Sequence, residues 1–225
     1  MSGTFSEELF LTNKTGSSLY HTYAEHMPII DYHCHLQPQE MYENQEFEDL
    51  GEMWLRGDHY KWRAMRCFGI DEKCITGDSS YYEKYMAFAS VLPRMIGNPI
   101  YIWCALELKR YFDIDEPVTA ANAQEIYDRT KALIREKHMT RRWCMEHSNV
   151  ELVSTTEDPT DNLEYHKKMQ QDPSMKTRVI SAFRPDRAMF LEEADFAEYM
   201  KLLGDSAGME VGSFAQMLDA LEARL

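Results

Sequence analysis

The chain has 225 residues, of which 44% are hydrophobic and 28% charged, a size and balance that suit one large or two small globular domains. Its 24 basic and 38 acidic residues give a net charge of −14, which argues against nucleic acid or an anionic membrane surface as a partner. Five cysteines without a C-x-x-C pair, no basic and apolar leader in MSGTFSEELFLTNKTG, and no apolar run of about 18 residues together predict a cytoplasmic protein.

The first predicted elements are a helix over residues 17–27 and a strand over residues 28–35, PIIDYHCH. Ser17 or Ser18 is expected to cap the helix, because a hydroxyl there can accept a backbone N–H of the first turn. The strand is predicted from its short run of apolar and β-branched residues, which is typical of a buried strand.

Residues 40–147 have a helical pattern almost throughout and predict a small helical bundle. Asn98 followed by Pro99 is a cap with proline at the first helical position, and Thr119 or Asn122 is expected to cap the last long helix. The helices expected in this block cover residues 58–68, 80–92, 98–111 and 119–138.

The remainder of the chain alternates strands with helices, which indicates βαβ units and a parallel sheet. At about 30 residues per unit, the residues outside the helical block suffice for about three strands, whereas a closed eight-stranded barrel needs about 250 residues. We therefore expect part of a larger α/β protein. The predicted strands are 149–155 and 176–183, and the predicted helices are 161–171, 192–203 and 213–225.

His33 and His35 are the first candidate site residues. Side chains two residues apart on a strand project from one face, so the two imidazoles could share a divalent metal, while Cys34 would point the opposite way. The pair also stands at the C-terminal end of the first strand, where α/β barrels place their sites. Chance occurrence of H-x-H among eight histidines is the alternative, and both interpretations stay open.

A second candidate is the segment 58–66, DHYKWRAMR, which gathers cations and aromatic rings in an otherwise acidic chain. Cations can bind a carboxylate and aromatic rings can stack on a sugar face. An amphipathic helix with a solvated basic face explains the same pattern, and from the residues alone we favour that explanation.

Two loops after predicted strands carry further candidates. Arg184, followed by Pro185, could hold a carboxylate through two parallel hydrogen bonds, or could form a structural ion pair with Asp186. Residues 155–161, TTEDPTD, could contact a polyol, although Asp161 is better explained as the cap of the next helix.

Four segments together resemble the uronate isomerase family of the metal-dependent amidohydrolase superfamily: residues 10–38, the segment GDHYKWRAMRCFGI, the stretch TTEDPTDNLEYH and AFRPDRAM. The resemblance covers nearly the whole chain in order, and Glu157 departs from it where an aspartate is expected. It implies the N-terminal part of a distorted (β/α)₈ TIM-like barrel with an all-α domain inserted after strand one. The corresponding division is 1–39 for the first helix and strand, 40–147 for the insertion and 148–225 for the incomplete barrel.

Site residues follow from the resemblance position by position. His33 and His35 match paired ligands of a divalent metal, for which zinc is expected. His59 and Tyr60 match a pair that contacts the substrate and assists catalysis, and Arg184 matches an arginine that binds substrate oxygens. The family's aspartate ligand and proposed base, with an arginine and a tryptophan, come later than this chain extends, so the ligand set is expected to be incomplete.

The implied reaction is the aldose–ketose isomerisation of D-glucuronate to D-fructuronate and of D-galacturonate to D-tagaturonate. The expected partner is a hexuronate, and the open edges of a three-stranded sheet also predict association, including homo-oligomers. We expect negligible turnover from these residues alone. The alternatives are a metal-dependent hydrolase of the same superfamily and a non-catalytic fragment.

Overall fold

The computed structural model describes residues 8–225, and the start of the segment inspected for a signal peptide lies outside this range. The chain forms two compact units. The first, called the helical unit, comprises the described residues up to Met27 together with Gln45–Cys144, and the second, called the sheet unit, comprises Pro28–Asn44 and Met145–Leu225. Within residues 8–225 there is no helix long and apolar enough to cross a membrane.

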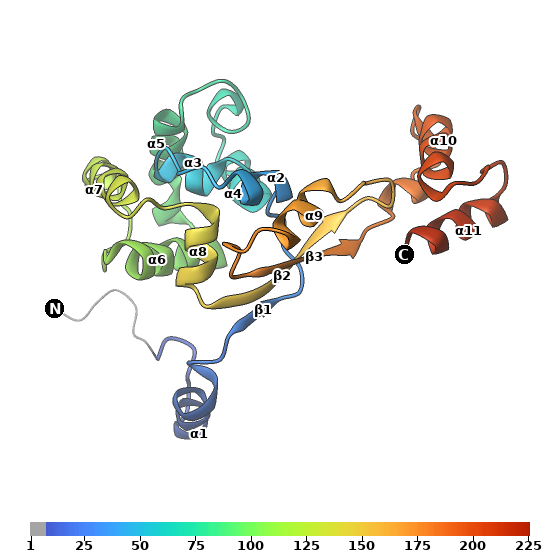
Figure 1. Cartoon of the computed structure of the whole chain (residues 1–225). Coiled ribbons are helices and arrows are strands. Elements are labelled where there is room, and N and C mark those ends of the chain that lie inside the picture. The colour runs from blue at the N-terminus through green and yellow to red at the C-terminus, as the bar shows by residue number, and fades with distance from the viewer. Residues whose placement is uncertain (1–7) are drawn as a thin grey trace. The chain divides into compact units, whose positions relative to one another are not determined.

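The helical unit contains the long helices that the sequence predicts between residues 58 and 138 (Figure 1). The six-residue helix α3 is not among the predicted helices, because it is too short to show a full apolar period. The elements are α1 (Lys14–Leu19), the π-helix η1 (Tyr20–Ala24), α3 (Leu50–Leu55), α4 (His59–Cys67), η2 (Glu72–Cys74), α5 (Tyr81–Val91), η3 (Leu92–Arg94), α6 (Pro99–Phe112) and α7 (Ala123–Glu136).

Helix caps explain where most of these helices begin. Ser80 forms a capping box at the start of α5, and Asn98 accepts the backbone N–H of Ile100 at the start of α6, as predicted. The prediction that Ser17 or Ser18 caps the first helix is wrong. Asn13 does so, because its side chain accepts the N–H of Gly16 and the helix starts earlier.

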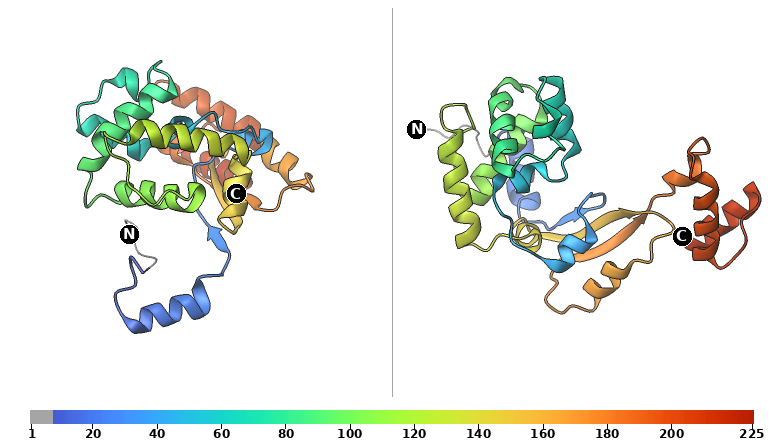
Figure 2. Two further views of the ribbon diagram at one scale, coloured as in Figure 1. Left: turned by 90° about the vertical axis from the view of Figure 1, so that its left-hand side faces the viewer. Right: turned by 90° about the horizontal axis from the view of Figure 1, so that it is seen from above.

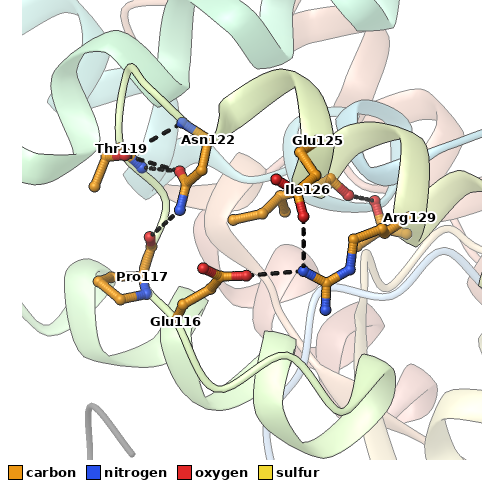
Figure 3. Close-up of polar contacts among 8 residues, drawn as sticks. Glu116, Pro117, Thr119, Asn122, Glu125, Ile126 and Arg129 are labelled. Atoms are coloured by element: carbon orange, nitrogen blue, oxygen red, sulfur yellow. Dashed lines mark hydrogen bonds and ion pairs between the residues drawn. The ribbon is translucent and has the colours of Figure 1, made fainter.

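Asn122 precedes α7 without capping it through its side chain (Figure 3). Its Oδ1 instead accepts hydrogen bonds from the backbone N–H and the hydroxyl of Thr119, at 2.7 and 2.9 Å, and its Nδ2 donates to the carbonyl of Pro117. About two turns further, Arg129 pairs with Glu116 at 2.8 Å. The expected cap residues therefore bind each other and fix the loop that enters the helix.

The core of the helical unit is centred on Trp54, Tyr85 and Phe88. The Trp54 ring lies 6.1 Å from that of Tyr85 and 5.9 Å from that of Phe88. Buried Asp49 caps α3 and also accepts the hydroxyl hydrogen of Tyr127 at 2.6 Å. A buried carboxylate thus ties the start of α3 to α7, far away in the chain.

The sheet unit is built on three parallel strands in the order β1–β2–β3, which the further views of Figure 2 show side by side. This confirms the prediction of about three parallel strands alternating with helices. Helix α9 packs against α2 and β3, and α10 packs against α11. The elements are β1 (Ile29–Asp31), α2 (Pro38–Glu43), β2 (Val150–Glu157), α9 (Glu164–Gln170), β3 (Arg178–Phe183), η4 (Asp186–Met189), α10 (Phe196–Ala207) and α11 (Phe214–Arg224), with α8 (Arg141–His147) leading into β2.

Strand β1 differs from its prediction in length and burial. It ends at Asp31, so His33 and His35 follow the strand and are not part of it, and Ile29 and Ile30 are exposed. The reason is that β1 pairs with β2 alone and forms an edge of the sheet. A continuous apolar run predicted a buried strand, but burial depends on neighbours that sequence does not show.

Candidate functional site

The two histidines after β1 converge on each other. Nε2 of His33 lies 3.2 Å from Nε2 of His35, and the rings meet edge to face with an interplanar angle of 83°. Between them the backbone N–H of Cys34 donates to the carbonyl of Ser154, which continues the pairing with β2 for one more bond. The two imidazoles therefore meet each other, while the side chain of Cys34 between them is buried.

The imidazole pair fits two ligands of one divalent ion. Two nitrogens 3.2 Å apart, each at a zinc–nitrogen distance of about 2.0–2.1 Å, subtend about 100° at the metal, close to a tetrahedral angle. Neutral imidazole nitrogens also suit the chemistry of zinc. Residues 8–225 contain no group of three histidine, cysteine or acidic side chains placed to hold a metal. The geometry of the pair is thus compatible with two ligands of a divalent ion, and a third protein ligand is not found among residues 8–225.

Cys34 is not a third candidate ligand. Burial raises the pKa of its thiol, and metal binding requires the thiolate. Its side chain packs with Met41, Met145, Val153 and Met169 in an apolar cluster of the sheet unit. The interpretation of Cys34 as a residue facing away from the histidines is in keeping with this packing.

Arg184 follows β3 as the two histidines follow β1, so all three lie beyond the C-terminal ends of parallel strands, although β1 ends opposite Val153 and β3 opposite Glu157. Its backbone N–H donates to the carbonyl of Glu157, while its Nε donates to Asp186 at 2.7 Å. Both side chains of this ion pair are exposed. The structural ion pair weighed in the sequence analysis is thus present, and it leaves the terminal nitrogens of the guanidinium at the surface.

His59 and Tyr60 form the first turn of α4 in the helical unit. Asp58 is the N-cap residue, and its Oδ1 accepts the backbone N–H groups of Tyr60 and Lys61 at 2.9 Å each. The His59 ring stacks on Trp62, with centroids 4.9 Å apart and an interplanar angle of 23°. The Tyr60 side chain is 61% exposed. An imidazole stacked on Trp62 and an exposed phenol beside Arg63 therefore stand at consecutive positions of this helix start.

Two residues of the 155–161 stretch, Thr155 and Glu157, belong to a buried polar cluster of the sheet unit whose third member, His166, was not predicted. Glu157 and His166 have side chains only 8% and 10% exposed, with 3.6 Å between Oε1 and Nε2, and the His166 Nε2 lies 2.8 Å from the hydroxyl of Thr155. The cluster borders a cavity of about 340 Å³ that His35 also lines. The available signal was that Thr155 and Glu157 are two residues apart on one strand, with a histidine in the next helix.

The prediction that Asp161 caps the helix after residues 155–161 is wrong. Asp161 does not cap α9, because its side chain accepts the N–H of Leu163 in the preceding turn, and Leu163 is the N-cap residue with a left-handed backbone. Asp158 accepts hydrogen bonds from Thr160 and from the hydroxyl of Tyr199. Hydrogen bonds to the carboxylates of Asp158 and Asp161 therefore stabilise this loop.

Burial of Glu157 gives a pH-dependent prediction. Desolvation raises the pKa of this carboxyl, and its Oε2 has no hydrogen-bond partner among the described residues. A raised acid pKa stabilises the fold at low pH, and this contribution is lost as the pH rises through the folded-state pKa. Glu157→Gln should therefore raise the free energy of unfolding at pH 8, and by less at pH 5.

The measurement is urea denaturation at both pH values. The exposed Glu151 on the same strand supplies the control variant Glu151→Gln, which should change stability little at either pH. An equal gain from Glu157→Gln at pH 5 and pH 8 would contradict the assignment. His166 is retained in every variant, because burial lowers its pKa and adds an opposite dependence at acid pH.

Comparison with known proteins places these features in a family. The glucuronate isomerase family matches residues 1–225. A uronate isomerase of Bacillus licheniformis is 47% identical over 220 residues, covering 98% of this chain and 46% of that protein. A uronate isomerase of Caldanaerobacter subterraneus is 45% identical, covering 97% of this chain and 47% of that protein. The chain thus spans about half the length of these curated relatives.

Solved structures agree with the sequence relatives. The crystal structure of a uronate isomerase from Thermotoga maritima matches with a TM-score of 0.89 and 34% identity, covering 97% of this chain and 48% of that one. A glucuronate isomerase from Caulobacter crescentus matches with a TM-score of 0.86 and 26% identity. The predicted fold, the N-terminal part of a TIM-like α/β barrel, is confirmed by these matches. The chain belongs to the glucuronate isomerase family.

Proposed function

We propose that this chain provides one half of a uronate isomerase, which interconverts D-glucuronate with D-fructuronate and D-galacturonate with D-tagaturonate. Membership of the family supports the proposal, and so does the one observation on which it chiefly rests: two imidazole nitrogens 3.2 Å apart at the end of a parallel strand. We also propose that it belongs to the metal-dependent amidohydrolase superfamily, with residues 40–147 as an inserted all-α domain. A cytoplasmic location is in keeping with five free cysteines.

We assign roles to five residues. His33 and His35 would hold a divalent ion, with zinc as the expected metal. His59 and Tyr60 would assist proton transfer at the sugar oxygens, since an imidazole and a phenol can each donate or accept a proton there. Arg184 would bind the substrate carboxylate or a neighbouring oxygen through its terminal nitrogens. Association into homo-oligomers stays a prediction.

Isomerisation requires movement of a proton from C2 to C1 of the open-chain sugar. A base removes the C2 proton, an enediolate forms with negative charge on oxygen, and C1 is then protonated. A bound divalent ion would supply Lewis-acid stabilisation of that charge. We assign the base to the portion of the relatives that this chain does not match. The residues of this chain would orient the sugar and hydrogen-bond its oxygens.

The test uses a hybrid, defined as this chain joined to the portion of the Bacillus licheniformis relative that it does not match. In D2O the hybrid should convert D-glucuronate to D-fructuronate with deuterium exchange detected by NMR, and the 225-residue chain alone should show negligible turnover. A folded hybrid without isomerase activity would contradict the proposal. Hydrolysis of esters, lactones or amides by that hybrid would favour the hydrolase alternative.

A further inference from the structure

We infer that Lys61 is a positioning residue, whose buried ammonium group fixes Asp58 and thereby the first turn of α4 that presents His59 and Tyr60. The inference rests on the proposed function for the importance of that pair, and it adds a residue to which no role has been assigned above. It concerns the helical unit alone.

The two oxygens of the Asp58 carboxylate have separate partners. Oδ1 accepts the backbone N–H groups of Tyr60 and Lys61, and Oδ2 accepts a hydrogen bond from Nζ of Lys61 at 2.7 Å. The Lys61 side chain is 7% exposed and that of Asp58 is 30% exposed. Lys61 therefore binds Oδ2 of the same carboxylate whose Oδ1 caps the helix.

Electrostatics keep this ammonium group charged. Burial by itself lowers the pKa of Lys61, but the nearby carboxylate of Glu107 and the contact with Asp58 outweigh it, so the pKa lies above its ordinary value. Burial also raises the pKa of Glu107. A buried ion pair is weak evidence for stability and better evidence for a fixed geometry. The solvated basic face favoured from sequence applies to exposed Arg63 and Arg66, and not to Lys61.

The orientation of the candidate pair depends on this first turn. Nε1 of Trp62 donates to the carbonyl of Leu55 at 2.7 Å, which fixes the indole on which the His59 ring stacks. The N–H groups of the first turn have no acceptor within the helix, so Asp58 supplies their acceptor. If the Asp58 carboxylate could rotate, the first turn of α4 would fray. His59 and Tyr60 would then no longer be held in one orientation.

Hydrogen exchange and NMR of the 225-residue chain test this inference. In Lys61→Met, the backbone amides of residues 60 and 61 should exchange about tenfold faster, because the Asp58 carboxylate that protects them is no longer held. The ring protons of His59 should lose the ring-current shift imposed by Trp62. The control is Lys73→Met, a replacement of an exposed lysine of the same unit, which should alter neither signal.

A second variant keeps the inference testable if Lys61→Met fails to fold. Asp58→Asn retains a capping side chain but removes the ion pair, so it should move the His59 signals in the same direction. Unchanged amide exchange and unchanged His59 signals in a folded Lys61→Met or Asp58→Asn chain would overturn the inference. Neither readout uses turnover, so an inactive hybrid would count against the proposed function and not against positioning by Lys61.

Discussion

Replacing His33 or His35 with alanine is expected to lower zinc affinity of the chain by more than about a hundredfold, since each removes one of two ligands. In the hybrid, the same replacements should reduce kcat/KM for D-glucuronate by about a thousandfold, because charge on the enediolate oxygen would lose its stabilisation. The structural basis is the 3.2 Å separation of the two Nε2 atoms. Zinc affinity is measured by competition with a chelating dye, and activity by NMR.

The matched control is His138→Ala. His138 is exposed and its Nδ1 pairs with Glu46 at 2.6 Å, so its removal should affect neither zinc affinity nor turnover. A hybrid carrying His33→Ala that keeps both its metal and its activity would refute the metal assignment. Loss of activity with unchanged zinc affinity would instead move the role of His33 from metal binding to substrate contact.

Gly51→Ala should destabilise the helical unit by about 3 kcal/mol or more. A Cβ added at Gly51, in the first turn of α3, would stand 2.1 Å from the carbonyl oxygen of Tyr81 and 2.7 Å from its carbonyl carbon. Both are backbone atoms at the start of α5. The clash can therefore be relieved only by moving a helix, and not by turning a flexible side chain. Glycine therefore permits the close approach of α3 and α5.

Urea denaturation followed by circular dichroism measures this effect. Gly57→Ala provides the control, because nothing lies within 4 Å of a Cβ added there. It should change the free energy of unfolding by less than about 0.5 kcal/mol. Equal midpoints for the Gly51→Ala chain and the parent chain would show that α3 and α5 are not packed as described.

Local chemistry explains why many element boundaries could be predicted. Asp58, Ser80 and Asn98 each cap a helix through bonds to residues two or three positions ahead, so the signal lies within a few residues of sequence. The boundaries that failed depend on distant partners. Asp161 was expected to cap α9, but it closes the preceding turn, in a loop that also contacts Tyr199 through Asp158.

In the candidate site, too, features set by near neighbours in sequence could be predicted, and features set by distant residues could not. The spacing of His33 and His35 was sufficient to predict that their rings share a side, although the strand ends before them. Nothing in the spacing of Lys61 distinguishes it from Arg63 or Arg66, because burial of an ammonium group depends on residues such as Glu107 on another helix. The partner of Glu157 was likewise hidden, since His166 reaches it only when α9 packs on the sheet.

By itself, the amino-acid sequence determined the alternation of strands and helices, the starts of α4, α5, α6 and α11, and the convergence of two imidazoles, because these follow from side-chain periodicity and bonds between near neighbours. Tertiary structure alone decided which charged groups are buried, where β1 stops and which glycine lets two helices approach closely. Those outcomes depend on desolvation and steric contact between segments far apart in the chain, and such contacts exist only once the chain has folded.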